Sequence, residues 1–206
     1  MENKVLLVVD IQNDFLPGGS LAVSNGNKIL PAVNRLIDKF DIIVATQDWH
    51  PADHISFASN HKSGNEYDVV DLNGISQVLW PDHCIQGSKG AAFHKDLKTD
   101  KFAAVIRKGF RKDLDSYSAF FENDKSTPTG LSGFLQTLKI TDVFICGIAL
   151  DYCVYFSAVD SLKCGFSTSI IVDASMGIDF PEDNIENTMN DFKSKGGYLV
   201  RSGDLL

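Results

Sequence analysis

Three side chains with complementary chemistry follow short apolar segments of this sequence. Asp10 ends the first apolar run, Lys108 follows the third, and Cys153 comes shortly after the fourth. Ligands of an open parallel sheet bind just beyond the carboxyl ends of its strands. An acid, a base and a thiol at three such ends therefore indicate a catalytic site.

Cys153 is the candidate nucleophile. It lies in GIALDYCVYF, where a predicted strand ends and an amphipathic helix begins. The unpaired N–H groups and dipole at such a helix start stabilise a thiolate, a nearby lysine would lower the thiol pKa further, and a carboxylate could relay the proton. The alternative is a small buried hydrophobic residue, the usual fate of a free cysteine. Asp10 and Lys108 at neighbouring strand ends favour the nucleophile.

The other three cysteines form no CxxC pair and no zinc-finger spacing. We interpret Cys146 and Cys164 as structural, whereas the role of Cys84, which adjoins His83, is left open. Free thiols are typical of a reducing compartment, so we expect a cytoplasmic protein.

The tripeptide Asp48-Trp49-His50 follows the second apolar run and suggests a metal site. In an extended chain, Asp48 and His50 point to the same side and can converge on one cation. A third ligand would come from His83 or His54. Such a mixed oxygen and nitrogen set suits zinc, iron(II) or manganese and leaves positions open for water or substrate. The alternative is a surface turn whose histidines bind nothing.

The spacing of apolar residues predicts the elements that position these groups. Short, β-branched runs predict strands, and apolar residues at helical spacing predict helices between some of them. The expected strands are 5–9, 42–45, 102–106, 143–146, 169–172 and 198–200, and the expected helices are 29–40, 131–138, 154–162 and 185–192. Their alternation predicts the α/β class, with three α/β/α layers around a mainly parallel sheet of about six strands.

One stretch, residues 58–101, is polar and shows no sustained period. A loop of this length is usually functional or disordered, and Trp80 and His83 within it favour a functional insertion. We find no linker or repeat, so we expect residues 1–206 to form a single domain.

Composition limits the classes of partner. The 206 residues include 19 basic and 27 acidic side chains, for a net charge of −8. This balance argues against nucleic acid and against anionic membrane surfaces. No apolar run approaches the length of a membrane span, and the first residues have no features of a secretory leader.

The motifs taken together resemble a known family, the nicotinamidase/pyrazinamidase branch of the isochorismatase-like cysteine hydrolases. The resemblance extends over nearly the whole chain. The five motifs, in order, are VDIQNDFLPGGSLAV (9–23), TQDWHPADHISF (46–57), LWPDHCIQGSKGAAFH (79–94), IRKGFRKDLDSYSAF (106–120) and GIALDYCV (147–154). The DWHP…H and WPxHC segments distinguish nicotinamidases from superfamily members that lack the metal.

The resemblance implies roles for individual residues. Asp10, Lys108 and Cys153 match the catalytic triad of the family. The matching metal ligands are Asp48, His50 and His83, with His54 aligned to an additional ligand in some members, and the cofactor is one divalent ion, with zinc preferred over iron or manganese. A cis peptide at the position of Ile148–Ala149 would turn the backbone N–H groups of Ala149 and Cys153 toward a developing oxyanion.

The resemblance also implies a substrate and a reaction. Nicotinamide would bind the metal through its pyridine nitrogen, form a thioester with the cysteine and release ammonia, after which water would yield nicotinate for pyridine nucleotide salvage. Residues that match the ring pocket are Phe15, Leu21, Trp80 and Tyr117, for which ordinary core packing is the alternative.

Other interpretations stay open. Leu150 stands where many relatives carry Thr. We expect this difference to affect which substrates the pocket prefers and not the type of reaction. A different amidase, acting on a carbamoyl or ureido compound, is disfavoured by the complete metal set. A non-catalytic metal-binding or partner-binding module is disfavoured by the complete triad. The sequence does not decide between a monomer and a homo-oligomer, or whether pyrazinamide is accepted.

Overall fold

A six-stranded sheet forms the centre of the protein, whose structure is a computed structural model that describes residues 3–72 and 74–205. The strand order is β5-β2-β1-β6-β7-β8, and every neighbouring pair is parallel. The strands are β1 (Lys4–Val9), β2 (Ile43–Asp48), β5 (Phe102–Lys108), β6 (Asp142–Ile148), β7 (Ser167–Met176) and β8 (Tyr198–Val200). The predicted α/β class, with its parallel sheet of six strands, is confirmed.

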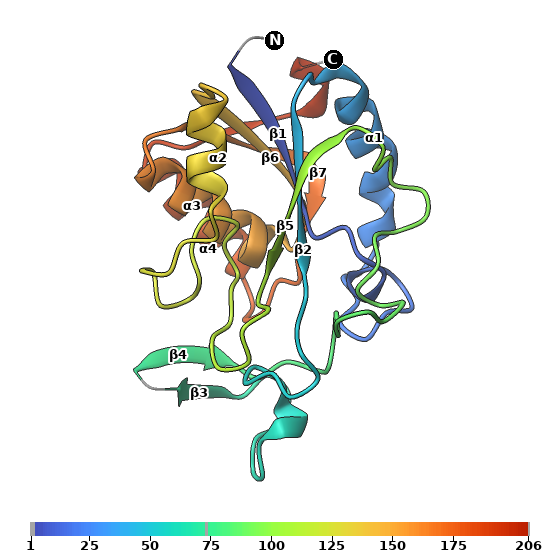
Figure 1. The fold of residues 1–206 in the computed structure, drawn as a ribbon, viewed down its shortest axis with the longest axis vertical. Helices are drawn as coiled ribbons and strands as arrows, with labels where there is room; N and C mark the ends of the chain where they lie inside the picture. The colour runs from blue at the N-terminus through green and yellow to red at the C-terminus, as the bar shows by residue number, and fades with distance from the viewer. Residues whose placement is uncertain (1–2, 73, 206) are drawn as a thin grey trace.

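Helices cover both faces of the sheet, as Figure 1 shows. Helix α1 lies on one side, and α2, α3 and α4 lie on the other. Their bounds are α1 (Leu30–Lys39), α2 (Leu131–Thr137), α3 (Tyr155–Lys163) and α4 (Asn184–Ser194), and shorter helical turns are η1 (Asn13–Phe15), η2 (Gly26–Ile29), η3 (Ala58–Asn60), η4 (Leu150–Val154) and η5 (Ser202–Asp204). Across residues 3–72 and 74–205, no helix combines the length and apolar character needed to cross a membrane.

The central strands are apolar because helices cover them on both sides. In β1, every residue from Val5 to Val9 is buried, and in β6 burial extends from Val143 to Ile148. A strand of this kind has no polar face, which is why these runs are continuous rather than alternating. Their side chains join those of the helices in one core cluster. The single-domain organisation stays a prediction.

Residues 58–101 contain regular structure that the sequence pattern did not reveal. Strands β3 (Val69–Leu72) and β4 (Ile75–Val78) pair in an antiparallel hairpin. Most of its side chains are exposed or half-buried, so the apolar alternation that predicts a strand is absent. The hairpin projects beyond the end of the sheet at which the strand carboxyl ends lie (Figure 1).

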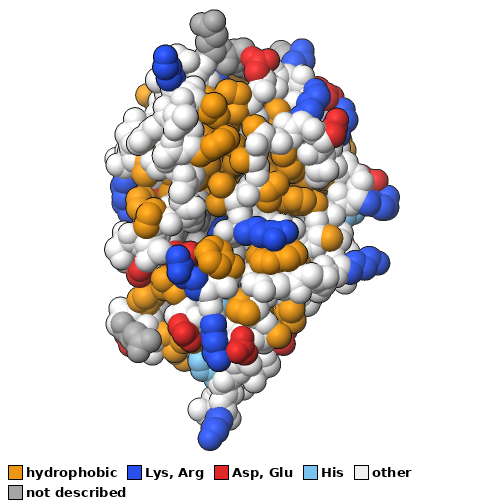
Figure 2. Space-filling model, in the orientation of Figure 1, with side chains coloured by type: hydrophobic (Ala, Val, Ile, Leu, Met, Phe, Trp, Pro, Cys, Tyr) orange, Lys and Arg blue, Asp and Glu red, His pale blue; other side chains and the backbone are white. Residues whose placement is uncertain are grey.

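Strand β5 forms one edge of the sheet. Its burial alternates along the chain, and outward-facing Val105 is 42% exposed. Figure 2 views the molecule from the side on which β5 lies in front, and hydrophobic side chains gather over the middle of this face.

Candidate active site

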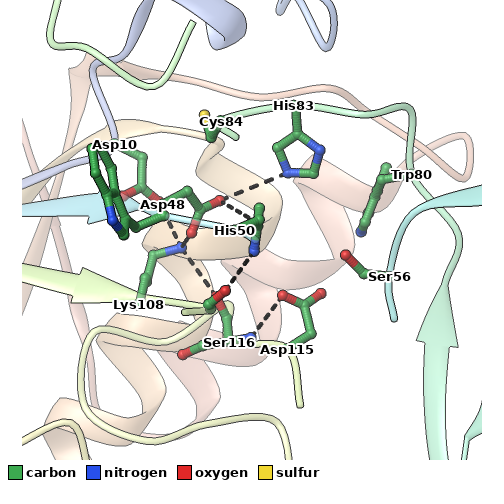
Figure 3. Close-up of polar contacts among 12 residues, drawn as sticks. Asp10, Asp48, His50, Ser56, Trp80, His83, Cys84, Lys108, Asp115 and Ser116 are labelled. Carbon is green, nitrogen blue, oxygen red and sulfur yellow. Dashed lines mark hydrogen bonds and ion pairs between the residues drawn. The ribbon is translucent and has the colours of Figure 1, made fainter. Parts of the chain in front are cut away.

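The structure brings the predicted triad together at the carboxyl ends of three strands. Asp10 directly follows β1, Lys108 is the last residue of β5, and Cys153 lies in the turn η4 that follows β6. Asp48, the last residue of β2, pairs in register with Lys108. Figure 3 shows Asp10, Asp48 and Lys108 converging on one point, although Asp10 and Lys108 are far apart in the sequence.

Lys108 is at the centre of the polar contacts. Its side chain is fully buried, and its ammonium Nζ lies 2.8 Å from Oδ2 of Asp10 and forms an ion pair with Oδ1 of Asp48. Nζ also lies 3.1 Å from the Ser116 carbonyl oxygen and 3.4 Å from Sγ of Cys153. Burial alone would lower the pKa of Lys108, but the two carboxylates raise it well above its ordinary value. Lys108 is therefore a fixed cation that contacts both the acid and the thiol.

Asp10 is held in place by Thr46 on the neighbouring strand. The Thr46 hydroxyl donates to Oδ1 of Asp10 at 2.6 Å and accepts from the Asp10 backbone N–H at 3.2 Å. Burial raises the pKa of Asp10 to about 6, with Lys108 opposing that shift. A carboxyl group with such a pKa can accept and return a proton near neutral pH. Sequence reasoning missed Thr46, because only strand pairing reveals its contact with Asp10.

Cys153 differs from the expected thiolate. Burial raises the pKa of its thiol well above the ordinary value; Lys108 lowers it, whereas Asp10 and Asp48 raise it further. The favourable effect of the lysine is outweighed, so burial favours the thiol over the thiolate. A carboxylate oxygen of Asp10 lies within 4.8 Å of Sγ. Removal of the thiol proton therefore has an acceptor close by.

The buried charges predict a large stability effect at Lys108. In the variant Lys108→Met, Asp10 and Asp48 stay buried without their cation. Breaking a buried ion pair in this way is expected to lower the free energy of unfolding by about 3–5 kcal/mol. Urea denaturation of chelator-treated protein measures the change. The double variant Lys108→Met/Asp10→Asn should recover part of the loss, and a Lys108→Met protein as stable as wild type would contradict this account.

Asp48, His50 and His83 form a second group beside the triad. Oδ2 of Asp48 lies 3.6 Å from Nε2 of His50 and 3.9 Å from Nε2 of His83. The other ring nitrogen of each histidine contacts a backbone carbonyl: Nδ1 of His50 lies 2.8 Å from the Gly109 oxygen, and Nδ1 of His83 lies 2.7 Å from the Pro81 oxygen. Because a carbonyl only accepts, each Nδ1 carries a proton, which leaves Nε2 as the ring atom available to a cation. Asp48 raises the pKa of His50, and a cation bound at Nε2 would take the place of the proton there.

This geometry fits a divalent cation. Zinc lies about 2.0–2.2 Å from nitrogen and oxygen ligands, so two ligands of one ion are at most about 4.4 Å apart. Both distances from Asp48 are within this limit. Burial lowers the pKa of His83 to about 4, which keeps its ring neutral. Asp48 uses its two oxygens differently, one toward the histidines and one toward Lys108, and so connects the cation site to the triad.

Gly109 allows His50 to reach its carbonyl partner. The residue has a φ of +61°, and a Cβ atom added there would lie 2.3 Å from Cε1 of His50. Only glycine permits both this backbone conformation and this approach. The segment after β5 therefore holds the ring of a candidate metal ligand.

His54 lies next to this group. Its ring centroid is 4.2 Å from that of His50, and its Nδ1 is 2.7 Å from Oγ of Ser56. The ligand atoms of His54 form a close group with those of His50 and Asp115, whereas Asp48 and His83 group with His50. A role for His54 as an additional metal ligand stays a prediction.

Cys153 of the triad and all three residues of the cation group line one pocket, whereas Asp10 and Lys108 are fully buried and do not belong to its described lining. All four predicted ring-pocket residues line it, and Trp80 donates a hydrogen bond from Nε1 to the Tyr117 hydroxyl at 3.0 Å. The complete lining is Phe15, Leu21, Asp48, His50, Trp80, His83, Asp115, Tyr117, Ala149, Tyr152, Cys153 and Ile178. Their contact with substrate stays a prediction.

Sequence reasoning missed Asp115, Tyr152 and Ile178 in this lining. The position of Tyr152 next to Cys153 could have indicated it, but nothing in the local sequence indicates Ile178. The peptide bond Ile148–Ala149 is cis, as the resemblance implied. Ala149 and Cys153 both line the pocket, and their role as an oxyanion hole stays a prediction.

Cys84, whose role the sequence left open, supports the loop beneath the site. Its side chain is fully buried, its backbone N–H donates to Oδ2 of Asp14 at 2.8 Å, and its carbonyl accepts from the His50 N–H at 3.1 Å. These backbone contacts fix the position of Cys84 and therefore of the chain beside the candidate metal ligand His83. Burial raises the pKa of its thiol well above the ordinary value, which disfavours reactivity.

Comparison with known proteins assigns the family. The model of the isochorismatase domain matches residues 4–204. The chain belongs to the isochorismatase family. A curated nicotinamidase from Acinetobacter baylyi is 44% identical to this isochorismatase-family protein over 204 residues, which cover 99% of this chain and 95% of the relative.

Solved structures extend the likeness to the fold. A nicotinamidase and pyrazinamidase of Acinetobacter baumanii superposes on this isochorismatase-family protein with a TM-score of 0.98 at 46% identity, covering 100% of this chain and 99% of the other. The pyrazinamidase of Pyrococcus horikoshii in complex with zinc gives a TM-score of 0.79 at 38% identity, covering 97% and 99%. The family resemblance inferred from the motifs is thus confirmed.

Proposed function

We propose that this isochorismatase-family protein is a nicotinamide amidohydrolase, which converts nicotinamide and water to nicotinate and ammonia. One observation carries the proposal: Cys153, which contacts Lys108 and through it Asp10, lines the same pocket as Asp48, His50 and His83. A cysteine amidase needs such a thiol with its acid and lysine, and a ring with a basic nitrogen is a natural ligand for a cation that Asp48, His50 and His83 would hold. The apolar and aromatic lining suits a flat heteroaromatic ring.

Acylation follows from the positions of the three catalytic side chains. The Cys153 thiol gives its proton to the Asp10 carboxylate as Sγ attacks the carboxamide carbon. Lys108, fixed between the two carboxylates and 3.4 Å from Sγ, stabilises the negative charge that develops on sulfur. The backbone N–H groups of Ala149 and Cys153 stabilise the oxyanion. Asp10 then protonates the departing nitrogen, the C–N bond breaks, and ammonia leaves a thioester on Cys153.

Deacylation uses the same groups in reverse. Asp10 takes a proton from the attacking water as its oxygen adds to the thioester carbon, and the C–S bond then breaks. Nicotinic acid leaves and ionises to nicotinate, and the proton on Asp10 returns to sulfur, so each cycle restores the thiol and the carboxylate. The pKa of about 6 that burial gives Asp10 suits a group that must both accept and donate a proton.

Asp48, His50 and His83 would hold one divalent cation, for which zinc is our choice because the donor set is one carboxylate and two imidazoles. When bound, the cation supplies a Lewis acid that fixes a pyridine nitrogen and withdraws electrons from the ring. The aromatic side chains of Phe15, Trp80 and Tyr117 then need only to hold the plane of the ring.

Ammonia release from nicotinamide tests the function. Reduced, zinc-supplied protein is expected to release ammonia and nicotinate in equal amounts, and a thiol alkylator should abolish the reaction. Cys164 is the free cysteine that is only half-buried, so the alkylation is done in parallel on Cys164→Ala. No release from reduced, metal-replete protein would contradict the proposal and favour a carbamoyl or ureido substrate.

A further inference from the structure

The segment that follows β7 contributes Ile178 to the lining of the active-site pocket, and we call residues 177–180 the wall. Ile178 lines the pocket, and the ring of Phe180 packs on Tyr67 with centroids 5.1 Å apart. Residues 177–183 belong to no helix or strand; they run between β7 and α4. Contacts other than regular secondary structure must therefore hold this wall in place.

Asp151, two residues before Cys153, supplies those contacts. Its carboxylate is buried, with 1% of the residue exposed. Oδ1 accepts from the Ile178 backbone N–H at 3.0 Å, and Oδ2 accepts from the Asp179 backbone N–H at 2.8 Å and from the Asn184 side-chain amide at 3.2 Å. Hydrogen bonds to a charged acceptor are stronger than neutral ones, so these three donors stabilise the buried charge and hold the wall.

Two neighbouring residues tighten the same connection. The hydroxyl of Tyr152 donates to the Phe180 carbonyl oxygen at 2.8 Å. A Cβ atom added to Gly177 would lie 2.8 Å from Oδ1 of Asp151 and 2.7 Å from Cδ1 of Ile185. The backbone thus passes so close to the carboxylate that a side chain at position 177 would push the wall or the carboxylate away.

We propose that Asp151 is a positioning residue that fixes the 177–180 wall relative to the Cys153 thiol and thereby limits the ring substituents that the pocket accepts. The proposal rests on the proposed nicotinamide amidohydrolase activity. One turn, η4, carries both the nucleophile and the anchor of the wall. A ring that packs against the wall therefore places its carboxamide carbon at a fixed distance from Sγ of Cys153. Losing the hydrogen bonds of Asp151 should weaken substrate binding more than it lowers kcat.

The variant Asp151→Asn tests this role with little change in size. Both oxygens of the Asp151 carboxylate accept hydrogen bonds, whereas the Asn side chain has one oxygen and one NH₂ group. In the variant, one donor of the wall therefore faces another donor and loses its hydrogen bond. We expect the KM for nicotinamide to rise about tenfold with kcat nearly unchanged, because an interaction made equally in the ground and transition states is lost. The preference for nicotinamide over 5-methylnicotinamide should shrink. Amide hydrogen exchange at residues 178 and 179 should become about tenfold faster.

Two further variants keep the test decisive. Gly177→Ala leaves the carboxylate intact but displaces the wall, and it should raise KM in the same way. Asp173→Asn is the matched control, because the Asp173 carboxylate also accepts a backbone N–H, that of Ser202 at 2.7 Å, but Ser202 is absent from the described pocket lining, whereas Ile178, which donates to Asp151, belongs to it. This control should leave KM and selectivity unchanged.

Several results would overturn the proposal. Unchanged exchange at residues 178 and 179 in Asp151→Asn would remove the anchoring role. A lower melting temperature with unchanged KM and selectivity in both Asp151→Asn and Gly177→Ala would leave only a structural role. An inactive wild-type protein would instead overturn the proposed function and the selectivity argument with it, while hydrogen exchange would still decide the anchoring.

Discussion

Replacing Cys153 with alanine is expected to lower kcat for nicotinamide hydrolysis by about 10⁴-fold or more, because no other described thiol lines the pocket. Zinc affinity should be nearly unchanged, since Cys153 is not one of the three expected ligands Asp48, His50 and His83. Ammonia release measures the first effect, and calorimetric titration with zinc measures the second.

The cysteine variant has a matched control. Cys164→Ala removes a half-buried thiol near the end of α3 and should keep wild-type turnover. If Cys153→Ala hydrolysed nicotinamide at a near-normal rate, Cys153 would not be the nucleophile. If it lost zinc as well as activity, the thiol would contribute to the metal site as well as to catalysis.

Replacing His50 with alanine is expected to remove both metal and activity. Loss of partners that merely orient a ligand costs about 10–100-fold in affinity, so loss of a ligand should weaken zinc binding by at least about 100-fold. The kcat/KM for nicotinamide should fall at least as much, because the ring would lose the group that orients it. Competition with a chromophoric chelator measures the affinity.

His94→Ala is the control for this variant. His94 lies in the same long segment as His83, but no described group of three metal-type ligands includes it. Thermal unfolding of both variants checks that they fold. Wild-type zinc affinity in His50→Ala would contradict the assignment of Asp48, His50 and His83 as the metal site.

The sequence predicted the sheet because its strands are covered on both faces. Runs such as residues 5–9 and 143–146 are continuously apolar, and the structure places them at the centre of the sheet as β1 and β6. The β3–β4 hairpin was not predicted, because its side chains are mostly exposed and carry no apolar period. A buried strand requires apolar residues and is therefore visible in the sequence, whereas an exposed hairpin tolerates polar residues and shows no such pattern.

Much of the candidate site could also be predicted, because reactive residue types at strand ends are informative. The sequence identified Asp10, Lys108 and Cys153 and the tripeptide that contains Asp48 and His50. It did not identify Thr46 as the partner of Asp10 or Asp151 as the anchor of residues 178 and 179. These contacts join segments that are distant in the chain, and Thr and Asp are too common for their type alone to indicate such a role.

The sequence by itself therefore determined which chemical groups the protein has and which strand ends carry them. Only the tertiary structure decided the surroundings that shift their pKa values. Position at a helix start and a nearby lysine favoured a thiolate at Cys153, but the folded chain excludes water from the thiol and places two carboxylates beside it, which raises its pKa. The same burial brings Asp10 to a pKa of about 6. Desolvation depends on everything that packs around a group, and no local stretch of sequence contains that information.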